Sequence, residues 1–349
     1  MKEITLPVVH GGQLSQVAAK FGLDDQGWLD LSTGISPISY PVPEVPVEYW
    51  QKLPHVSEQL LQLAQSYYRA DNVLISHGSQ SIIQCLPKII QTDLTFNSVL
   101  DGKQPLRVWI PASGYREHRY CWQKQQASII EYQQLPLNTQ IKTGDIVVVI
   151  NPNNPTGELY QPSFIHQLAQ QLAQKQGWLI IDEAFMDVCA PEYWYRPAQL
   201  MTRCIVLRST GKFFGLAGIR AGCVIANDNL LTQIATELGP WHVNGVALWA
   251  MEQALADTQW QLAQRQRLAQ YANALLTMLT RHFPGEKISG TDLFKTVYLA
   301  NSQDCFEQLC QQKVYVRLCD EKNALRFGIP LPDDLDRLDQ ALLQLKAYH

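Results

Sequence analysis

The sequence predicts an α/β protein, in which a large domain with a mostly parallel sheet covered by helices precedes a smaller α+β domain. In the first two thirds of the chain, short apolar runs alternate with stretches of helical periodicity, the pattern of parallel strands joined by helices. After about Gly239, two long helical stretches follow each other directly, which indicates a second domain. A chain of 349 residues, 46% of them hydrophobic, is long enough for two cores.

Residues 1–46 are expected to be irregular, because they hold five prolines between Pro7 and Pro46. The large domain should contain helices at 57–68 and 161–175 and strands at 107–110, 145–150, 178–181, 204–207 and 222–226. The small domain should contain helices at 244–257, 259–282 and 303–311, strands at 294–299, 314–318 and 324–328, and a closing helix. We therefore predict an N-terminal arm (1–46), a large domain (47–240) and a small domain (241–349).

Composition excludes several classes of protein. The formal charge of −4 comes without any basic run, so no nucleic-acid partner is expected. No run of 18 apolar residues suggests a membrane span, and the N-terminus lacks the apolar core of a secretion signal, so we expect a cytoplasmic protein. The eight cysteines form no C-x-x-C pair, which predicts reduced thiols in or near the core and no metal site.

Three polar loops of the large domain each follow an apolar strand. They are Asn151–Gly157 (NPNNPTG), Asp182–Phe185 (DEAF) and Ser209–Arg220 (STGKFFGLAGIR). The segments between them are long enough for a helix and a returning strand, so the three loops can meet at one edge of the sheet. In open α/β sheets, ligands bind beyond the carboxyl ends of the strands. The sequence therefore places a candidate site at these loops.

The loops hold the groups that an enzyme using pyridoxal 5′-phosphate (PLP) requires. Lys212 can carry the cofactor aldehyde as a Schiff base, and Asp182 can keep the pyridine nitrogen protonated. Asn154 can donate to the ring hydroxyl from a loop shaped by proline and glycine, and Tyr115 can stack on the ring. PLP is therefore the predicted cofactor.

The cofactor phosphate requires hydroxyls, a cation and free backbone N–H groups. Ser209 and Arg220 flank the lysine and can supply the first two. The segment Gly78-Ser79-Gln80 precedes an apolar stretch and is typical of a glycine-rich helix start, where Ser79 and Gln80 offer free N–H groups. Each motif alone has a plainer explanation, such as a surface lysine, a helix cap or a simple turn. The order and spacing of the whole set favour the PLP site.

These motifs resemble, over nearly the whole chain, the fold-type I PLP enzymes of the aspartate aminotransferase superfamily. Within its histidinol-phosphate aminotransferase-like branch, the chain is most similar to the L-threonine-O-3-phosphate decarboxylases of cobalamin biosynthesis. The segments that carry this likeness are His10-Gly11-Gly12, residues 29–37 (LDLSTGISP), residues 76–87 (SHGSQSIIQCLP) and DEAF.

The resemblance implies PLP-dependent decarboxylation of a small phosphorylated amino acid, with Lys212 and Asp182 as catalytic residues. It also implies a homodimer with no membrane partner and an N-terminal arm that folds over the active site. Arg326, in ALRFGIP, matches the superfamily arginine that binds the substrate carboxylate, for which a planar guanidinium is suited. Further substrate-binding candidates come from the N-terminal arm: His10, Gly11, Gly12, Ser32, Thr33 and Gly34.

Two positions depart from the pattern of many aminotransferases. Phe185 stands where they have a tyrosine that supports the ring oxygen, and this difference favours decarboxylation. Leu53 stands where many relatives have a tyrosine that reaches the neighbouring subunit's cofactor phosphate, so the sequence leaves that contact open. The alternatives left open are an aminotransferase acting on histidinol phosphate or a similar amino compound, and a non-catalytic protein that keeps the fold.

Overall fold

The computed structural model describes residues 11–93, 105–136, 138–196 and 203–345. Their contacts divide the chain into two compact units. The large unit consists of Ile38–Asn154 and Glu158–Arg265, and the small unit of Met1–Pro37, Pro155–Gly157 and Gln266–His349. The predicted boundaries at 46 and 240 differ from this division, because the N-terminal segment packs with the C-terminal one and the change of unit falls inside a helix.

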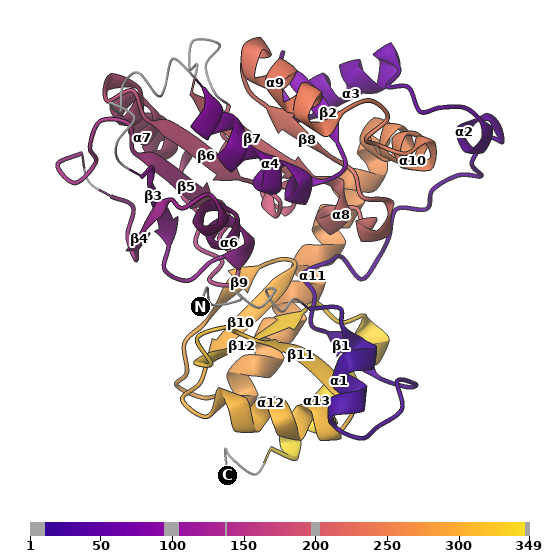
Figure 1. The fold of residues 1–349 in the computed structure, drawn as a ribbon. Coiled ribbons are helices and arrows are strands. Elements are labelled where there is room, and N and C mark those ends of the chain that lie inside the picture. Colours follow the sequence, from indigo (N-terminus) through magenta and orange to yellow (C-terminus); the bar gives the residue numbers. More distant parts are fainter. Residues whose placement is uncertain (1–10, 94–104, 137, 197–202, 346–349) are drawn as a thin grey trace. The chain divides into compact units, whose positions relative to one another are not determined.

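The large unit is built on a seven-stranded sheet (Figure 1). In spatial order its strands are β2 (Val73–Ser76), β8 (Gly222–Ile225), β7 (Cys204–Ser209), β6 (Trp178–Asp182), β5 (Ile146–Ile150), β3 (Arg107–Pro111) and β4 (Ser128–Tyr132). Only β8 runs against its neighbours. Every residue of β5, β6 and β7 is buried, so both faces of the sheet are covered there. The predicted α/β fold is confirmed.

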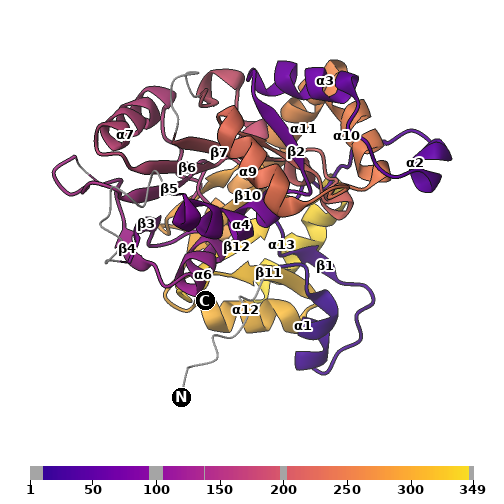
Figure 2. The same ribbon diagram turned by 45° about the horizontal axis from the view of Figure 1, so that its top comes forward.

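Helices α3 (Glu58–Tyr68), α4 (Ser79–Thr92), α6 (Arg116–Lys124), α7 (Pro162–Gln174) and α9 (Asp228–Leu238) pack on the strands of this sheet (Figure 2). Helix α8 (Thr210–Phe213) follows β7 directly, and α2 (Glu48–Gln51) and α3 pack on α10 (Gly245–Ala256). The apolar faces of α4, α6 and α9 share one core with alternate residues of β3, β5, β6 and β7. This alternation follows from the two-residue period of a strand.

The small unit has a five-stranded sheet in the order β1 (Leu29–Leu31), β11 (Val314–Leu318), β12 (Ala324–Gly328), β10 (Phe294–Tyr298) and β9 (Ile288–Thr291). Its helices are α1 (Leu14–Lys20), the C-terminal part of α11 (Thr258–His282), α12 (Ser302–Gln311) and α13 (Leu335–Leu343). Only the β1–β11 pair is parallel. The α+β layout predicted for the C-terminal part is therefore observed.

The expectation that residues 1–46 are irregular is wrong, since α1 and β1 lie within them. Strand β1 has only three residues, and its order comes from pairing with distant β11, where Leu29 lies opposite Val314 and Leu31 opposite Val316. Such a partner leaves no local periodicity in the sequence. Strands β2, β4 and β9 were missed for a similar reason, because each is the outermost strand of its sheet and pairs with a strand on one side only.

All eight cysteines are free thiols, and all but Cys85 and Cys189 are buried, as the sequence predicts. Within the described ranges, no helix has both the length and the apolar character needed to cross a bilayer.

The packing of α7 against β6 generates a stability prediction. A Cβ added at Gly177 would lie 2.4 Å from the carbonyl oxygen of Asp145 and 2.9 Å from Cδ2 of Leu172. Gly177→Ala should therefore lower the free energy of unfolding by about 1–3 kcal/mol, the usual cost of overpacking, as measured by urea denaturation. Gly218→Ala is the matched control, because a Cβ there has no atom within 4 Å. Equal stability of the two variants would contradict the packing described.

Candidate active site

The carboxyl ends of β5, β6 and β7 lie side by side, and each leads into one of the three predicted loops. Backbone hydrogen bonds join these ends. The amide of Asn151 donates to the carbonyl of Asp182 (2.8 Å), and the amide of Glu183 donates to the carbonyl of Leu207 (2.9 Å). The parallel register thus brings residues distant in sequence to one edge, as the loop positions predict.

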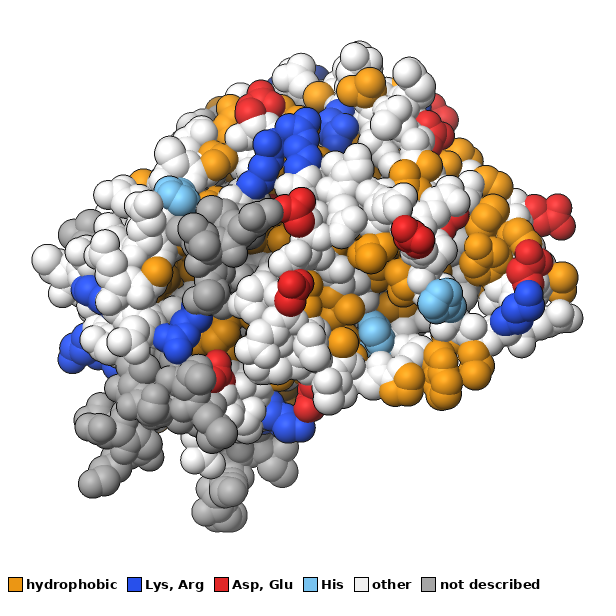
Figure 3. All heavy atoms as spheres, turned by 90° about the horizontal axis from the view of Figure 1, so that it is seen from above, with side chains coloured by type: hydrophobic (Ala, Val, Ile, Leu, Met, Phe, Trp, Pro, Cys, Tyr) orange, Lys and Arg blue, Asp and Glu red, His pale blue; other side chains and the backbone are white. Residues whose placement is uncertain are grey.

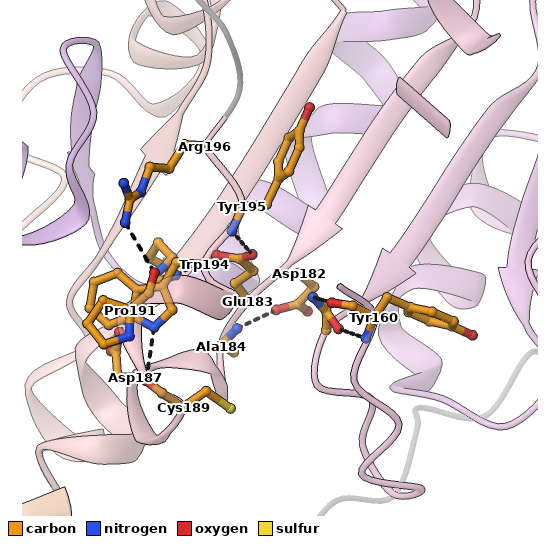
Figure 4. Close-up of polar contacts among 12 residues, drawn as sticks. Tyr160, Asp182, Glu183, Ala184, Asp187, Cys189, Pro191, Trp194, Tyr195 and Arg196 are labelled. Carbon is orange, nitrogen blue, oxygen red and sulfur yellow. Dashed lines mark hydrogen bonds and ion pairs between the residues drawn. The ribbon is translucent and has the colours of Figure 1, made fainter. Parts of the chain in front are cut away.

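Asp182 is a buried acid at this edge, with 3% of its surface exposed. Its Oδ1 accepts the amide of Ala184 (3.0 Å; Figure 4), and its Oδ2 lies 3.0 Å from Nε2 of His118. An ionised Asp182 therefore selects the histidine tautomer that donates from Nε2. A buried carboxylate held by two donors is a fixed negative charge at the end of the sheet, suited to pair with a protonated ring nitrogen.

Lys212 lies in α8, directly after β7. Its Nζ is 5.4 Å from the centroid of the Phe185 ring, so the amine faces the loop that also carries Asp182. Asn154 is half-buried at the end of the loop after β5. The preceding residue, Asn153, donates from Nδ2 to the carbonyl of Ser113 (2.8 Å) and so fixes this loop.

Backbone N–H groups and a guanidinium gather where β2 and β7 end and β8 begins, and we call this group the cradle. Gly222 stands opposite both Ser76 and Ser209, so the last residues of β2 and β7 flank one position of β8. Gly78, with φ of 86°, turns the chain into α4, whose first turn has no side-chain cap. A Cβ at Gly78 would lie 3.3 Å from Nη2 of Arg220. The guanidinium therefore lies beside the free N–H groups of Ser79 and Gln80.

Tyr115 is joined to this cradle through Gln80. The Tyr115 hydroxyl donates to Oε1 of Gln80 (2.9 Å), and Nε2 of Gln80 donates to Oε2 of Glu117 (2.6 Å). Burial raises the pKa of Tyr115 well above its usual range, so the hydroxyl remains a donor at neutral pH. The Tyr115 ring meets the ring of His118 edge-on, with the centroids 6.3 Å apart. The ring predicted to cover the cofactor thus lies beside the histidine that contacts Asp182.

This donor set fits PLP. A buried carboxylate, a primary amine and a helix start with a neighbouring guanidinium match the ring nitrogen, the aldehyde and the phosphate of that cofactor. Sequence reasoning assigned no role to Glu117 and His118. They could have been found from the sequence, because they lie in the first turn of the helix that follows Tyr115.

A second group of predicted residues gathers within the small unit. Arg326 is 7% exposed, donates from Nη2 to the carbonyl of Ser32 (2.7 Å), and has its guanidinium 5.4 Å from the Phe294 ring centroid. Burial lowers the pKa of Arg326 to about 10, which leaves the guanidinium charged at neutral pH. A buried cation of this kind is suited to bind an anion.

The N-terminal candidates pack around the same serine. The amide of Gly12 donates to the Ser32 hydroxyl (2.8 Å), and a Cβ at Gly11 would lie 2.4 Å from the Ser32 carbonyl oxygen. The carbonyl oxygen of Thr33 lies equally close to a Cβ at Gly328, two residues after Arg326, and Gly34 is buried beyond it. His10 lies outside the described residues. Gly11, Gly12 and Thr33 are thus brought together with Ser32 and the Arg326 strand.

Sequence reasoning missed Arg317. It stands directly opposite Arg326 in the β11–β12 pair, and its Nη2 donates to Oδ1 of Asp320 (2.7 Å). Two guanidinium groups at opposed positions of adjacent strands point to the same face of the sheet. The missed signal was one arginine in each of two neighbouring predicted strands.

Behind the site, a buried arginine joins two carboxylates. Arg208 donates from Nη1 to Oε2 of Glu183 and from Nη2 to Oδ1 of Asp187, and all three are at most 1% exposed. The other Glu183 oxygen accepts the amide of Tyr195 (3.1 Å; Figure 4). We call these three residues the Arg208 network. Burial would lower the pKa of Arg208, but the facing carboxylates raise it overall.

A family model described as aminotransferase class I and II matches residues 49–342. The threonine-phosphate decarboxylase of Pseudomonas aeruginosa is 34% identical over 97% of this chain and 98% of its own. The enzyme of the same name from a Sinorhizobium species is 32% identical over 98% of this chain and 100% of its own.

Among solved structures, the histidinol-phosphate aminotransferase of Sinorhizobium meliloti in complex with pyridoxal-5′-phosphate has a TM-score of 0.80. It is 16% identical and covers 98% of this chain and 95% of its own. At that identity the likeness shows the fold, which agrees with the predicted fold-type I architecture.

The Arg208 network generates a prediction on pH. Burial raises the pKa of Glu183 from 4.5 to about 7, although Arg208 acts against this shift. Between these values the folded protein holds a proton that the unfolded chain does not. This contribution to stability is therefore complete below pH 4.5 and is lost as the pH rises to about 7.

Relative to Glu183→Gln, the wild-type protein should thus lose unfolding free energy between pH 5 and pH 7.5, by up to about 3 kcal/mol. Urea denaturation of both proteins across that range measures the difference. If the difference in unfolding free energy between the two proteins did not change with pH, Glu183 would not titrate in this range.

Proposed function

The chain belongs to the class I and II aminotransferase family, and from this premise we propose that it decarboxylates L-threonine O-3-phosphate with PLP as cofactor. The product is 1-amino-2-propanol O-phosphate, used in cobalamin biosynthesis. The observation that carries the proposal is the near full-length likeness, at 34% and 32% identity, to two threonine-phosphate decarboxylases. The arrangement of Asp182, His118 and Lys212 supports it.

When bound, PLP supplies an electron sink that lets a bond at the substrate Cα break. Asp182, held by His118, keeps a proton on the pyridine nitrogen, while Asn154 donates to the ring hydroxyl. Ser209, Arg220 and the amides of Ser79 and Gln80 hold the cofactor phosphate.

The Lys212 amine would hold the cofactor aldehyde and, when released from it, would be one group able to carry the proton that takes the place of CO2 on the substrate Cα. Phe185, the ring that faces this amine, offers no hydroxyl to the ring oxygen of the cofactor.

The small unit supplies the substrate-binding residues. Arg326 binds the carboxylate, and its burial strengthens this charge-assisted contact. Arg317, opposite Arg326 in the sheet, adds a second cation for the substrate phosphate. The amide of Gly11 and the hydroxyl of Thr33 complete this phosphate site, together with His10, Gly12 and Gly34. Most of these groups come from the N-terminal segment that packs with the C-terminal part of the chain in the small unit.

We also propose that the protein acts as a homodimer in the cytoplasm. Four large apolar side chains of the large unit lie exposed at 59–67%: Val47, Trp50, Leu53 and Trp241. The face in Figure 3 shows hydrophobic side chains gathered toward the side where α2 and α10 lie in Figure 1. Apolar surface of this kind is typical of subunit contacts. The eight free thiols suit a reducing compartment.

The main test is the reaction with L-threonine phosphate. The wild-type protein with PLP should release CO2 and form 1-amino-2-propanol phosphate. Lys212→Ala should lose the visible absorption band of the bound cofactor and reduce turnover by roughly 10²–10⁴-fold or more. Lys88→Ala is the control, because Lys88 is an exposed lysine paired with Glu237. A keto product without CO2 would instead identify an aminotransferase, the second function that these residues permit.

The role of Arg326 has its own test. Arg326→Gln should weaken binding of L-threonine phosphate by about 2 kcal/mol or more, roughly 30-fold, because a charge-assisted contact is lost. Inhibition by 1-amino-2-propanol phosphate should be unchanged, since this product has no carboxylate. Arg281→Gln, an exposed position of the small unit, is the control. Equal losses for substrate and product would contradict a carboxylate contact at Arg326.

A further inference from the structure

The Arg208 network occupies the strand positions next to two cofactor-binding residues. Glu183 directly follows Asp182 at the end of β6, and Arg208 directly precedes Ser209 at the end of β7. Successive side chains of a strand point to opposite faces. The Glu183–Arg208 ion pair therefore lies on one side of the sheet end, while Asp182 and Ser209 point to the other.

Aromatic rings and backbone hydrogen bonds surround the network. The Arg208 guanidinium lies between two aromatic rings, 4.8 Å from the Tyr68 centroid and 4.5 Å from that of Trp194. The Glu183 carboxylate accepts the amide of Tyr195, and the backbone carbonyl of Asp187 accepts from Nε of Arg265 (2.9 Å). These contacts hold the guanidinium and the two residues that it binds.

Stability alone is a poor explanation of this arrangement. Moving three charges out of water costs several kcal/mol for each ion, and apolar side chains of similar volume often stabilise a protein as well or better. An ion pair of this kind adds geometric specificity, because a guanidinium that binds two carboxylates fixes both the distance and the angle between them. Here it fixes the position of the end of β6 relative to the end of β7.

We propose that the Arg208 network is a positioning device that sets Asp182 and Ser209 at the separation required by the ring nitrogen and phosphate of PLP. The inference rests on the proposed function and extends it to residues that do not touch the cofactor. The Glu183–Arg208 pair lies on the face of the sheet opposite to Asp182 and Ser209, and it keeps these two cofactor-binding residues at a fixed separation. Loss of the pair should weaken cofactor binding beyond what a general loss of stability explains.

The chain offers a matched control at the amino ends of the strands of the same sheet. Asp145 is fully buried and accepts from Nε of Arg107 (2.8 Å) and Nε1 of Trp109 (2.7 Å). It precedes β5, which separates it from the carboxyl edge by about 17 Å at 3.3 Å per residue. Asp145→Asn therefore disturbs a similar buried carboxylate far from the site.

The experiment compares Glu183→Gln with Asp145→Asn in the full-length protein. Arg208 and the Tyr195 amide bind different oxygens of Glu183, and in glutamine one of these positions becomes an NH2 group, which cannot accept from either donor. Each variant is measured for its PLP dissociation constant, for the pH midpoint of the visible band, and for its melting temperature without cofactor. We expect Glu183→Gln to weaken PLP binding roughly tenfold and to move the midpoint, while Asp145→Asn stays within about twofold of wild type.

Arg208→Lys provides a second variant if Glu183→Gln does not fold, because lysine keeps the charge but cannot bind two carboxylates as a fork. Equal effects of the network and control variants on PLP binding, in proportion to their loss of melting temperature, would overturn the positioning role. Wild-type PLP affinity in Glu183→Gln would overturn it too, while leaving the proposed function intact. Failure of the wild-type protein itself to bind PLP would overturn both.

Discussion

The site depends on one buried carboxylate. Asp182 lies at the end of a strand that is buried at every position, where an unpaired charge would be costly. Two donors, the amide of Ala184 and the ring of His118, make the charge tolerable there and fix its direction. A carboxylate in this position is shielded from water, so it can act on a protonated ring nitrogen more strongly than a solvated one.

The parallel sheet explains why the other residues of the site lie near this carboxylate. Because β5, β6 and β7 run in the same direction, their following loops meet at one edge, and the turn at Gly78 points α4 into the same region. Helix α6 adds His118 and Glu117 from a single turn. Each residue is placed by an element whose own order comes from the apolar core, so the polar groups are held without having to stabilise the fold.

The sequence was informative where structure is local and where motifs carry chemistry. Strands such as 178–181 and helices such as 161–175 have their own periodicity, and their ends differ from those observed by one residue. The loops NPNNPTG, DEAF and STGKFFGLAGIR lie together at the sheet edge as expected. Prediction failed where a strand or a site depends on a partner distant in sequence. Strand β1 is ordered by pairing with β11, and Arg317 becomes a site candidate only because it lies opposite Arg326. No role could be assigned to His118, because sequence alone does not show which acid its ring contacts.

We expect Asp182, positioned by its neighbours, to receive the ring nitrogen of PLP while Lys212 holds the aldehyde. A crystal structure of the protein prepared with PLP would show this arrangement directly. It should contain continuous electron density from Nζ of Lys212 to the cofactor, and an Asp182 carboxylate oxygen within hydrogen-bonding distance of the ring nitrogen. A cofactor bound elsewhere, or a ring nitrogen that faces away from Asp182, would contradict this arrangement.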